Sequence, residues 1–327
     1  MKLKDNSLAA SLASVLVIFT AMISPYIALL IATAIWGFAG PVIKFTLGFV
    51  PPFTFLFYRF LLSSLVIVLP FIWHLRKNSI RIKDLPKLTF LAILATTINL
   101  GLIFLGFDKT SALDGTLINS LTPIFIVIGG VMFLKEKVTK IERIGLAIAI
   151  TGTTVTILQP FLEEAAFARQ NLIGNLLILT AGIEWAAYTL IAKEDLRKHP
   201  PFLHTAWSSF VALATFLPLA LWENPNFLAP AEVRLVLTNS GALLGIGFMA
   251  IFSYLIAYYT HYVGLRTIEA SETALFVYLQ PLFAAPLAIF WLGEPITFPF
   301  LVGAILIALG VFLTEYKPRR REIGFRV

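Results

Sequence analysis

The chain has 327 residues, of which 58% are hydrophobic, only 13% are charged and none is cysteine. About a quarter of the residues of a soluble domain are charged, so this composition excludes a chain whose whole surface faces water. The lack of cysteine excludes disulfides and thiolate metal sites. Apolar runs of about 20 residues, rather than alternating runs of about 10, predict an all-α polytopic membrane protein embedded in a lipid bilayer.

The net charge of +7 comes mainly from lysines and arginines in the loops, so it indicates membrane orientation and no nucleic-acid partner. Counted over alternate loops, 18 of these residues fall on one side and 4 on the other. Because positive charge accumulates on the cytoplasmic side, we expect a multi-pass protein of the cell (plasma or inner) membrane. Its basic tail, residues 317–327, is then cytoplasmic.

Residues 1–25 form an N-terminal apolar segment in which Ser7–Ser24 follows the charged stretch "MKLKD". We expect an extra membrane-associated helix here, with a spanning helix or a signal-like leader as alternatives. Further along, apolar runs separated by short loops predict ten transmembrane helices. Their ranges are 27–45, 52–73, 87–107, 112–133, 142–160, 172–192, 203–222, 241–264, 271–292 and 297–315.

The two halves of the chain repeat each other. The segment "LTPIFIVIGGVMFLKEKVTKIERIG", which starts at Leu121, matches "LQPLFAAPLAIFWLGEPITFPFLVG", which starts at Leu279, at an offset of 158 residues. Earlier in each half the offset is 149, which aligns Trp36 with Trp185. The chain therefore divides into two five-helix repeats, residues 26–158 and 171–316.

Because five is odd, two consecutive copies cross the membrane in opposite senses, which predicts two inverted repeats. Inverted halves give a protein two shapes of similar energy that open to opposite sides, with a central site between the repeats. This arrangement favours alternating access. The alternative is a duplication for stability alone, as in helical solenoids, but solenoid copies stack in the same sense.

Several motifs resemble a known family in their order along both halves. They are "AIWG" in the first predicted span, "YRFLLSSLVIVLP" in the second, "IEWAAYTLIAK" in the sixth and the two long segments quoted above. In these the chain resembles the EamA-type transporters of the drug/metabolite transporter superfamily over nearly its whole length. The resemblance implies ten helices around a central cavity and the export of small metabolites or amino acids.

Enzyme signatures are missing from the sequence. It contains no H-E-x-x-H, G-x-S-x-G or Walker-type motif, and we find no carboxylate–histidine cluster. We therefore expect no enzyme, no cofactor and no metal. Transport must then use a solute gradient, exchange or a coupled ion, for which a proton is a candidate.

Two charged residues lie within predicted spans and have no counterpart in the other repeat. A charge near the bilayer centre costs at least ~2.5–3.5 kcal/mol, so both should face the bundle interior. Glu184 is a candidate proton carrier or anchor for a cationic substrate, or else a carboxyl bonded to a neighbouring helix. Arg59 is a candidate substrate ligand, or else ties helices together through backbone carbonyls. A direct ion pair between them is attractive, but their estimated depths differ by about 10 Å, of which boundary error and the reach of arginine could close about half.

Aromatic and neutral polar residues within spans complete the candidate substrate site. Each has a simpler alternative: aromatic rings also populate membrane interfaces, amides and hydroxyls also bond neighbouring helices, and a lone histidine is commonly structural. Thr122 and Gln280 occupy equivalent positions before a proline, which can break a helix and expose a carbonyl. The candidates are Trp36, Asn99, Asn119, Thr122, Trp185, Tyr188, Tyr254, Tyr258, His261, Tyr278 and Gln280.

Glu136 and Glu294 follow equivalent spans, each directly before the next helix. A carboxylate there can accept hydrogen bonds from free backbone N–H groups, so we interpret both as helix caps.

Taken together, these patterns predict a secondary active transporter of small organic molecules such as amino acids, with export as the direction. The alternative is a non-transporting membrane sensor or scaffold that reuses the fold. A monomer and a homodimer are both compatible with the sequence.

Overall fold

The computed structural model describes residues 24–78, 80–134, 140–162, 168–268 and 270–315, and within them every regular element is helical. In this part of the chain, seven helical stretches are long and apolar enough to cross a membrane, and three shorter apolar helices accompany them. The prediction of an all-α polytopic membrane protein is confirmed. Most of the N-terminal segment, the basic tail and Glu136 lie outside the described residues.

The first repeat contains five consecutive helical stretches, two of which are subdivided. Proline in the first turn opens α2 and α3, where its missing N–H costs nothing. The elements are α2 (Pro25–Leu47), α3 (Pro52–Lys77), η1 (Ile82–Asp84), α4 (Leu85–Ala92), η2 (Ile93–Ile98), α5 (Asn99–Lys109), α6 (Ala112–Asn119), α7 (Thr122–Leu134) and α8 (Lys140–Leu162).

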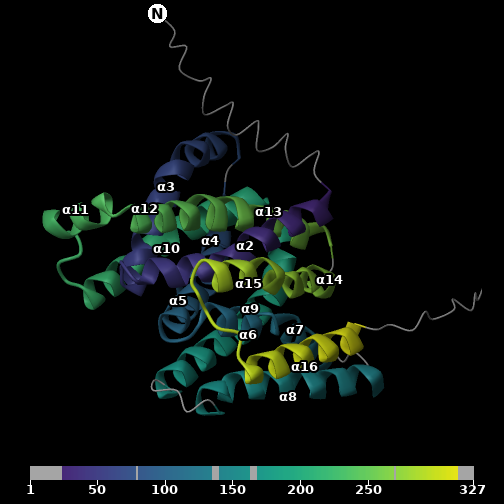
Figure 1. Ribbon diagram of the computed structural model, residues 1–327. Coiled ribbons are helices and arrows are strands. Elements are labelled where there is room, and N and C mark those ends of the chain that lie inside the picture. Colours follow the sequence, from purple (N-terminus) through teal and green to yellow (C-terminus); the bar gives the residue numbers. More distant parts are fainter. Residues whose placement is uncertain (1–23, 79, 135–139, 163–167, 269, 316–327) are drawn as a thin grey trace, which may run out of the picture.

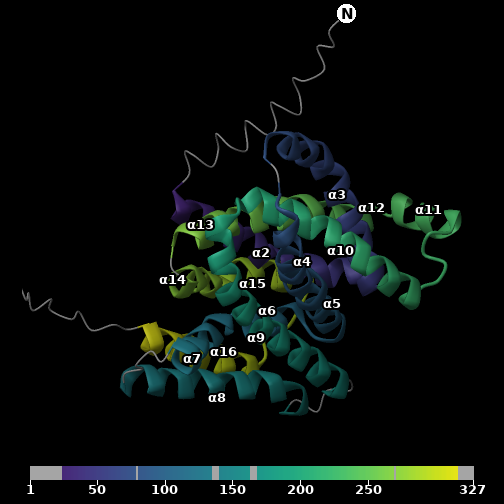
Figure 2. The same cartoon turned by 180° about the vertical axis from the view of Figure 1, so that it is seen from behind.

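The second repeat follows the same plan after an added helix in the connection, α11 (Pro230–Thr238). None of the residues of α11 is buried, and the helix lies beside the bundle (Figures 1 and 2). The elements of the repeat are α9 (Ala168–Lys198), α10 (Pro201–Glu223), α12 (Ser240–Gly247), η3 (Phe248–Ile256), α13 (Ala257–Thr267), α14 (Ala270–Leu275), η4 (Phe276–Leu279), α15 (Gln280–Phe290) and α16 (Phe298–Glu315).

Helix irregularities recur at equivalent positions in the two repeats. The third stretch of each repeat contains a π-helical segment, η2 or η3, and residues 93–98 align with residues 251–256. The fourth stretch breaks between α6 and α7, and its equivalent passes through the 3-10 turn η4. A proline follows each break, as the sequence predicted. Both kinds of irregularity release backbone carbonyls from the usual helical pattern.

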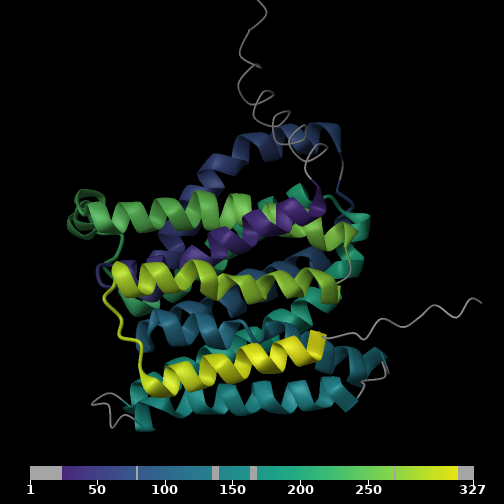
Figure 3. The same ribbon diagram turned by 45° about the vertical axis from the view of Figure 1, so that its right-hand side comes forward.

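The closest contact between the repeats joins α8 to α16, which lie side by side and run in opposite directions (Figure 3). Gly152 packs against the backbone of Gly303, and Gly310 packs against Gly145 and Ala149. Gly152 follows Gly145 on α8, but its partner Gly303 precedes Gly310 on α16. The two equivalent helices are therefore antiparallel. The predicted inversion of the repeats is confirmed.

Other contacts repeat under the same symmetry. Lys44 donates a hydrogen bond to the carbonyl of Phe107, 3.0 Å away, and its counterpart Lys193 donates to the equivalent carbonyl of Leu265 at 2.5 Å. Each lysine therefore caps the carbonyl end of the third stretch of its own repeat, where positive charge is favoured.

Glu294 acts as a helix cap, but for a different helix than the sequence suggested. Its carboxylate accepts hydrogen bonds from the backbone N–H groups of Ala112, at 2.7 Å, and Leu113, at 2.8 Å, which open α6 in the other repeat. Burial raises the pKa of Glu294, while these bonds and the charge of Lys44 oppose the rise. The cap therefore ties the second repeat to the first.

Candidate functional site

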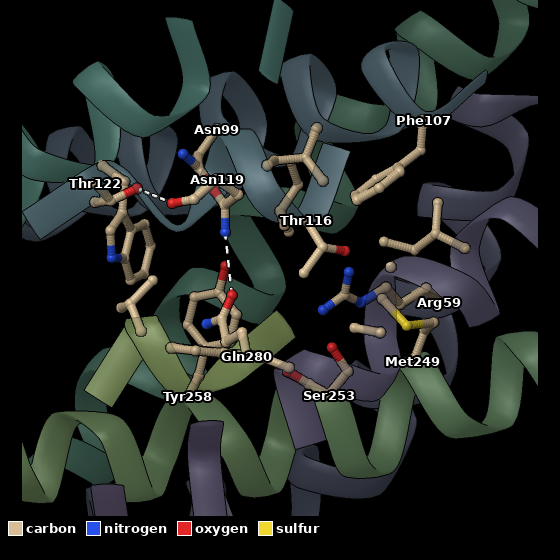
Figure 4. Close-up of a pocket in the computed structure, with 18 residues that line it drawn as sticks. Arg59, Asn99, Phe107, Thr116, Asn119, Thr122, Met249, Ser253, Tyr258 and Gln280 are labelled. Atoms are coloured by element: carbon tan, nitrogen blue, oxygen red, sulfur yellow. Dashed lines mark hydrogen bonds between the residues drawn. The ribbon is translucent and has the colours of Figure 1, made fainter. Parts of the chain in front are cut away.

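A cavity lies between the two repeats, and elements of both line it (Figure 4). The empty space within it is about 720 Å³, which includes volume open to solvent. The lining residues are Trp36, Ala39, Gly40, Ile43, Arg59, Asn99, Leu100, Ile103, Phe107, Thr116, Asn119, Thr122, Trp185, Met249, Ser253, Tyr258, Val277 and Gln280.

Arg59 is the only charged residue among those that line the cavity. Its side chain is 0% exposed, and its guanidinium lies within 5.7 Å of the ring centroids of Phe60, Phe104 and Tyr254. Within the described residues, none of its three guanidinium nitrogens has a hydrogen-bond partner. The guanidinium points into the cavity toward Thr116 and Ser253 (Figure 4). A guanidinium carries five N–H donors, and those of Arg59 are unpaired within the described residues.

The π-helical segments fix two aromatic walls of the cavity. The indole N–H of Trp36 donates to the carbonyl of Ser253 at 3.0 Å, and the hydroxyl of Tyr258 donates to the carbonyl of Ala95 at 3.1 Å. Ala95 and Ser253 are equivalent residues of η2 and η3, so each carbonyl released by a π segment positions one aromatic side chain.

Trp185 breaks this symmetry. Its counterpart Trp36 bonds the carbonyl of Ser253, but the equivalent carbonyl of Ala95 is taken by Tyr258. The ring of Trp185 packs edge-on against Trp36, with centroids 5.8 Å apart. Its indole N–H makes no hydrogen bond within the part of the chain that the structure describes, so it is a second donor available to a ligand.

Glu184 lies behind the wall of the cavity and not on it. The side-chain amide of Asn99 donates to Glu184 Oε2 at 2.8 Å and to the carbonyl of Ala181 at 2.9 Å. The other carboxyl oxygen, Oε1, is buried and has no hydrogen-bond partner among the described residues. Asn99, which does line the cavity, therefore connects it to the carboxyl group.

The two helix breaks meet across the cavity. The side-chain amide of Asn119 donates to Gln280 Oε1 at 3.2 Å, which joins the break between α6 and α7 to the start of α15 (Figure 4). The hydroxyl of Thr122 donates to the carbonyl of Asn119 at 2.7 Å. The bond from Thr122 satisfies the backbone carbonyl of Asn119 at the break. The bond between the side chains of Asn119 and Gln280 holds both amides at the cavity surface.

Eight of the thirteen sequence-based candidates line the cavity. They are Trp36, Arg59, Asn99, Asn119, Thr122, Trp185, Tyr258 and Gln280.

The remaining five lie behind the cavity or apart from its wall. Tyr188 donates a hydrogen bond to Tyr262, and Tyr254 donates to the carbonyl of Thr205. His261 packs against Trp36 with ring centroids 4.9 Å apart, and Tyr278 lies in η4 outside the lining. Glu184 makes no ion pair with Arg59 within the described residues, in agreement with the depth difference estimated from the sequence.

Sequence reasoning missed several lining residues. Ser253 and Thr116 offer polar groups, and Met249 and Phe107 offer apolar surface. Ser253 and Thr116 could have been found, since both are neutral polar residues within predicted spans, as Asn119 and Thr122 are. Met249 and Phe107 carry no signal that separates a cavity wall from a packed core.

Comparison with known proteins decides the family. The model of the EamA-like transporter family matches residues 23–158 and 172–316, which together make up most of the chain. The chain belongs to the EamA-like transporter family. The resemblance noted from the sequence motifs is confirmed, and the chain is a multi-pass membrane transporter.

Relatives of this transporter span nearly its whole length. An "Uncharacterized transporter" of Archaeoglobus fulgidus is 27% identical over 292 residues, covering 89% of this chain and 99% of the relative. "Uncharacterized transporter YyaM" of Bacillus subtilis is 28% identical over 288 residues, covering 88% and 92%. A solved crystal structure with 19% identity matches with a TM-score of 0.60 over 90% of this chain and 98% of that one, which supports the fold alone.

Proposed function

We propose that this transporter is a secondary active exporter of small metabolites that carry a carboxylate, amino acids above all. It works by alternating access, with the central site between the two repeats and with proton coupling through Glu184. The single observation that carries the substrate class is Arg59, a buried guanidinium that faces the cavity and has no hydrogen-bond partner among the described residues.

Burial of that guanidinium is energetically costly. A charge taken out of water costs several kcal/mol unless it is paired and hydrogen-bonded. Aromatic faces within 5.7 Å return only part of this cost. A carboxylate fits the remaining need because it accepts two parallel N–H bonds from arginine and cancels its charge.

The rest of the cavity suits an amphipathic molecule of this kind. The indole N–H of Trp185 is a further donor, and the rings of Trp36 and Tyr258 offer apolar surface. Hydroxyl and amide groups of Thr116 and Asn119 line the same cavity and can accept bonds from an ammonium group. The direction of transport rests on the family resemblance of the sequence motifs.

The test measures counterflow in proteoliposomes with a neutral amino acid, its carboxamide, the corresponding decarboxylated amine, a polyamine and a sugar. We expect the amino acid to exchange at least ~10-fold faster than its carboxamide or amine, because a hydrogen bond to a charged group is worth ~1.5–3 kcal/mol. Equal exchange of acid and carboxamide contradicts the proposed substrate class. No flux of any compound through correctly inserted protein favours the sensor or scaffold alternative.

The variant Arg59→Met should abolish this exchange without unfolding the protein. Because the guanidinium makes no hydrogen bond within the described residues, we expect the melting temperature without substrate to stay the same or rise. Arg234→Gln, a change at an exposed arginine of α11, is the matched control and should behave as the wild type. Wild-type exchange by Arg59→Met would rule out the carboxylate site.

A further inference from the structure

Three side chains that can bind a metal meet at one end of the bundle, away from the cavity. Asp195 lies in the last turn of α9, His199 directly follows that helix, and His204 lies in the first turns of α10. Asp195 Oδ2 is 3.0 Å from His199 Nδ1 and 3.2 Å from His204 Nε2. The sequence-based expectation of no carboxylate–histidine cluster is therefore wrong. The turn at Pro200 and Pro201 folds α10 back beside α9 and brings the three together.

The three ligand atoms all lie within 4.8 Å of one another. In tetrahedral coordination with bonds of ~2.0–2.2 Å, neighbouring ligand atoms lie roughly 3.3–3.6 Å apart. The two distances from Asp195 Oδ2 are close to this spacing. His204 Nε2 lies 3.2 Å from Asp195 Oδ2, so the buried carboxylate oxygen is shared by two imidazoles.

Two charged side chains, Asp84 and Lys87, lie beside these ligands. The far ring nitrogen of His199, Nε2, lies 3.5 Å from the carboxylate of Asp84 in η1. Metal-binding histidines commonly donate their other N–H to a carboxylate in this way, which orients the ring and raises its basicity. Lys87 Nζ lies 3.2 Å from the second oxygen of Asp195, which leaves Oδ2 for the metal.

Burial supports a site rather than a surface cluster. Asp195 and His204 are both 2% exposed, so their polar atoms have little access to water. The side chain of His199 is 17% exposed, which leaves a path for an ion and for a water molecule as a fourth ligand. Two imidazoles and one carboxylate with an open position are a ligand set that suits Zn²⁺.

We propose that Asp195, His199 and His204 bind a divalent transition-metal ion, Zn²⁺ by the chemistry of the ligands. The ion would join α9 to α10 and, through Asp84 and Lys87, to the start of α4. Because Asp84 and Lys87 belong to the first repeat and the three ligands to the second, the site fastens the two repeats together at the end of the bundle that we predict to be cytoplasmic.

The experiment titrates the tag-free full-length protein in detergent with Zn²⁺ alone by calorimetry and with Co²⁺ alone by visible absorption. We expect one metal equivalent per chain and a Co²⁺ absorption band typical of coordination by histidine and carboxylate. His199→Ala should lose both signals, and Asp84→Asn should keep the stoichiometry but weaken the affinity roughly 10–100-fold. His74→Ala is the matched control. His74 lies at the end of α3 and contacts Phe202, so this variant should leave both signals unchanged.

Absence of a stoichiometric metal in the wild type, or unchanged binding by His199→Ala, overturns the proposal and leaves a network of carboxylate–imidazole bonds. Size-exclusion profiles establish that each variant is folded. If His199→Ala does not fold, Asp84→Asn decides: unchanged affinity contradicts the site, and a 10–100-fold loss supports it. The result is independent of the transported substrate, because no step of the titration requires transport.

Discussion

Glu184 combines two properties that matter for coupling. One carboxyl oxygen accepts a hydrogen bond from Asn99, and the other is buried without a partner in the described part of the chain. Asn99, which lines the cavity, connects the carboxyl group to it. In the proposed coupling, loading and release of a proton on Glu184 would reach the cavity through Asn99, without direct contact between the carboxyl group and the substrate.

The variant Glu184→Gln should separate substrate exchange from proton-driven accumulation. Glutamine keeps the shape and the bond to Asn99 but holds no exchangeable charge, so counterflow should stay within a few-fold of the wild type. Accumulation driven by a pH gradient should be lost, as measured by the substrate ratio across proteoliposome membranes. Glu194→Gln is the matched control on the same helix, since that side chain is 68% exposed and pairs with Lys198. Accumulation by Glu184→Gln that equals the wild type at every pH would remove the proton-carrier role.

At the scale of helices, the pair formed by α8 and α16 depends on glycine. A methyl group at Gly152 would lie 2.8 Å from the backbone nitrogen of Ile307 and 2.9 Å from the carbonyl oxygen of Gly303. Both distances are too short for a carbon atom, and backbone atoms cannot turn away as a side chain can. Close approach of small residues is a common way to join helices in lipid, where no hydrophobic effect drives them together.

We expect Gly152→Ala to force α8 and α16 apart and to destabilise the protein by about 1–3 kcal/mol, the usual cost of overpacking. Thermal unfolding in detergent measures this as a lower melting temperature. Gly247→Ala is the control, because no atom lies within 4 Å of its added methyl group and alanine favours the helix. If the Gly152→Ala protein is as stable as the Gly247→Ala protein, the contact between α8 and α16 does not depend on glycine at position 152.

The sequence predicted the positions of the helices better than their departures from regular α-helical geometry. Apolar run length gave the spans, and the repeated prolines at Pro123 and Pro281 marked the two breaks. The π segment at Ile93–Ile98 could not be predicted, because it sits inside an uninterrupted apolar run and is supported by the distant bond from Tyr258. Helix α11 lies between the spans predicted over 203–222 and 241–264 and was not predicted, although Pro230 in its first turn is a start signal.

The candidate site was predictable only in part, because membership in a cavity depends on which helix face turns inward. Arg59 and Trp185 stood out from the sequence, one as a charge in a span and the other as the counterpart of Trp36. Glu184 stood out equally as a charge in a span, yet it does not line the cavity. It accepts a hydrogen bond from Asn99, which does. The cluster at Asp195 escaped because its ligands come together only through the turn between two helices.

For the whole molecule, the inverted repeat has a mechanical consequence. Symmetry relates the bond from Lys44 to Phe107 to that from Lys193 to Leu265, and it relates η2 to η3. In the proposed alternating access, the two halves, which are built alike but oppositely directed, would exchange their conformations to give a second shape of similar energy that opens on the other side. Alternating access therefore requires that a residue in the central cavity be reachable from each side in turn.

The lack of cysteine makes this directly testable with Ser253→Cys, a small change at a residue that lines the cavity. We expect a membrane-impermeant thiol reagent to label this cysteine in both right-side-out and inside-out vesicles, and saturating substrate to slow labelling from either side. Thr238→Cys, in the exposed last turn of α11, is the control and should react from one side only, which also establishes the orientation of the bundle. A cavity cysteine that reacts from a single side under every substrate condition would contradict alternating access, because the site would then open to one compartment only.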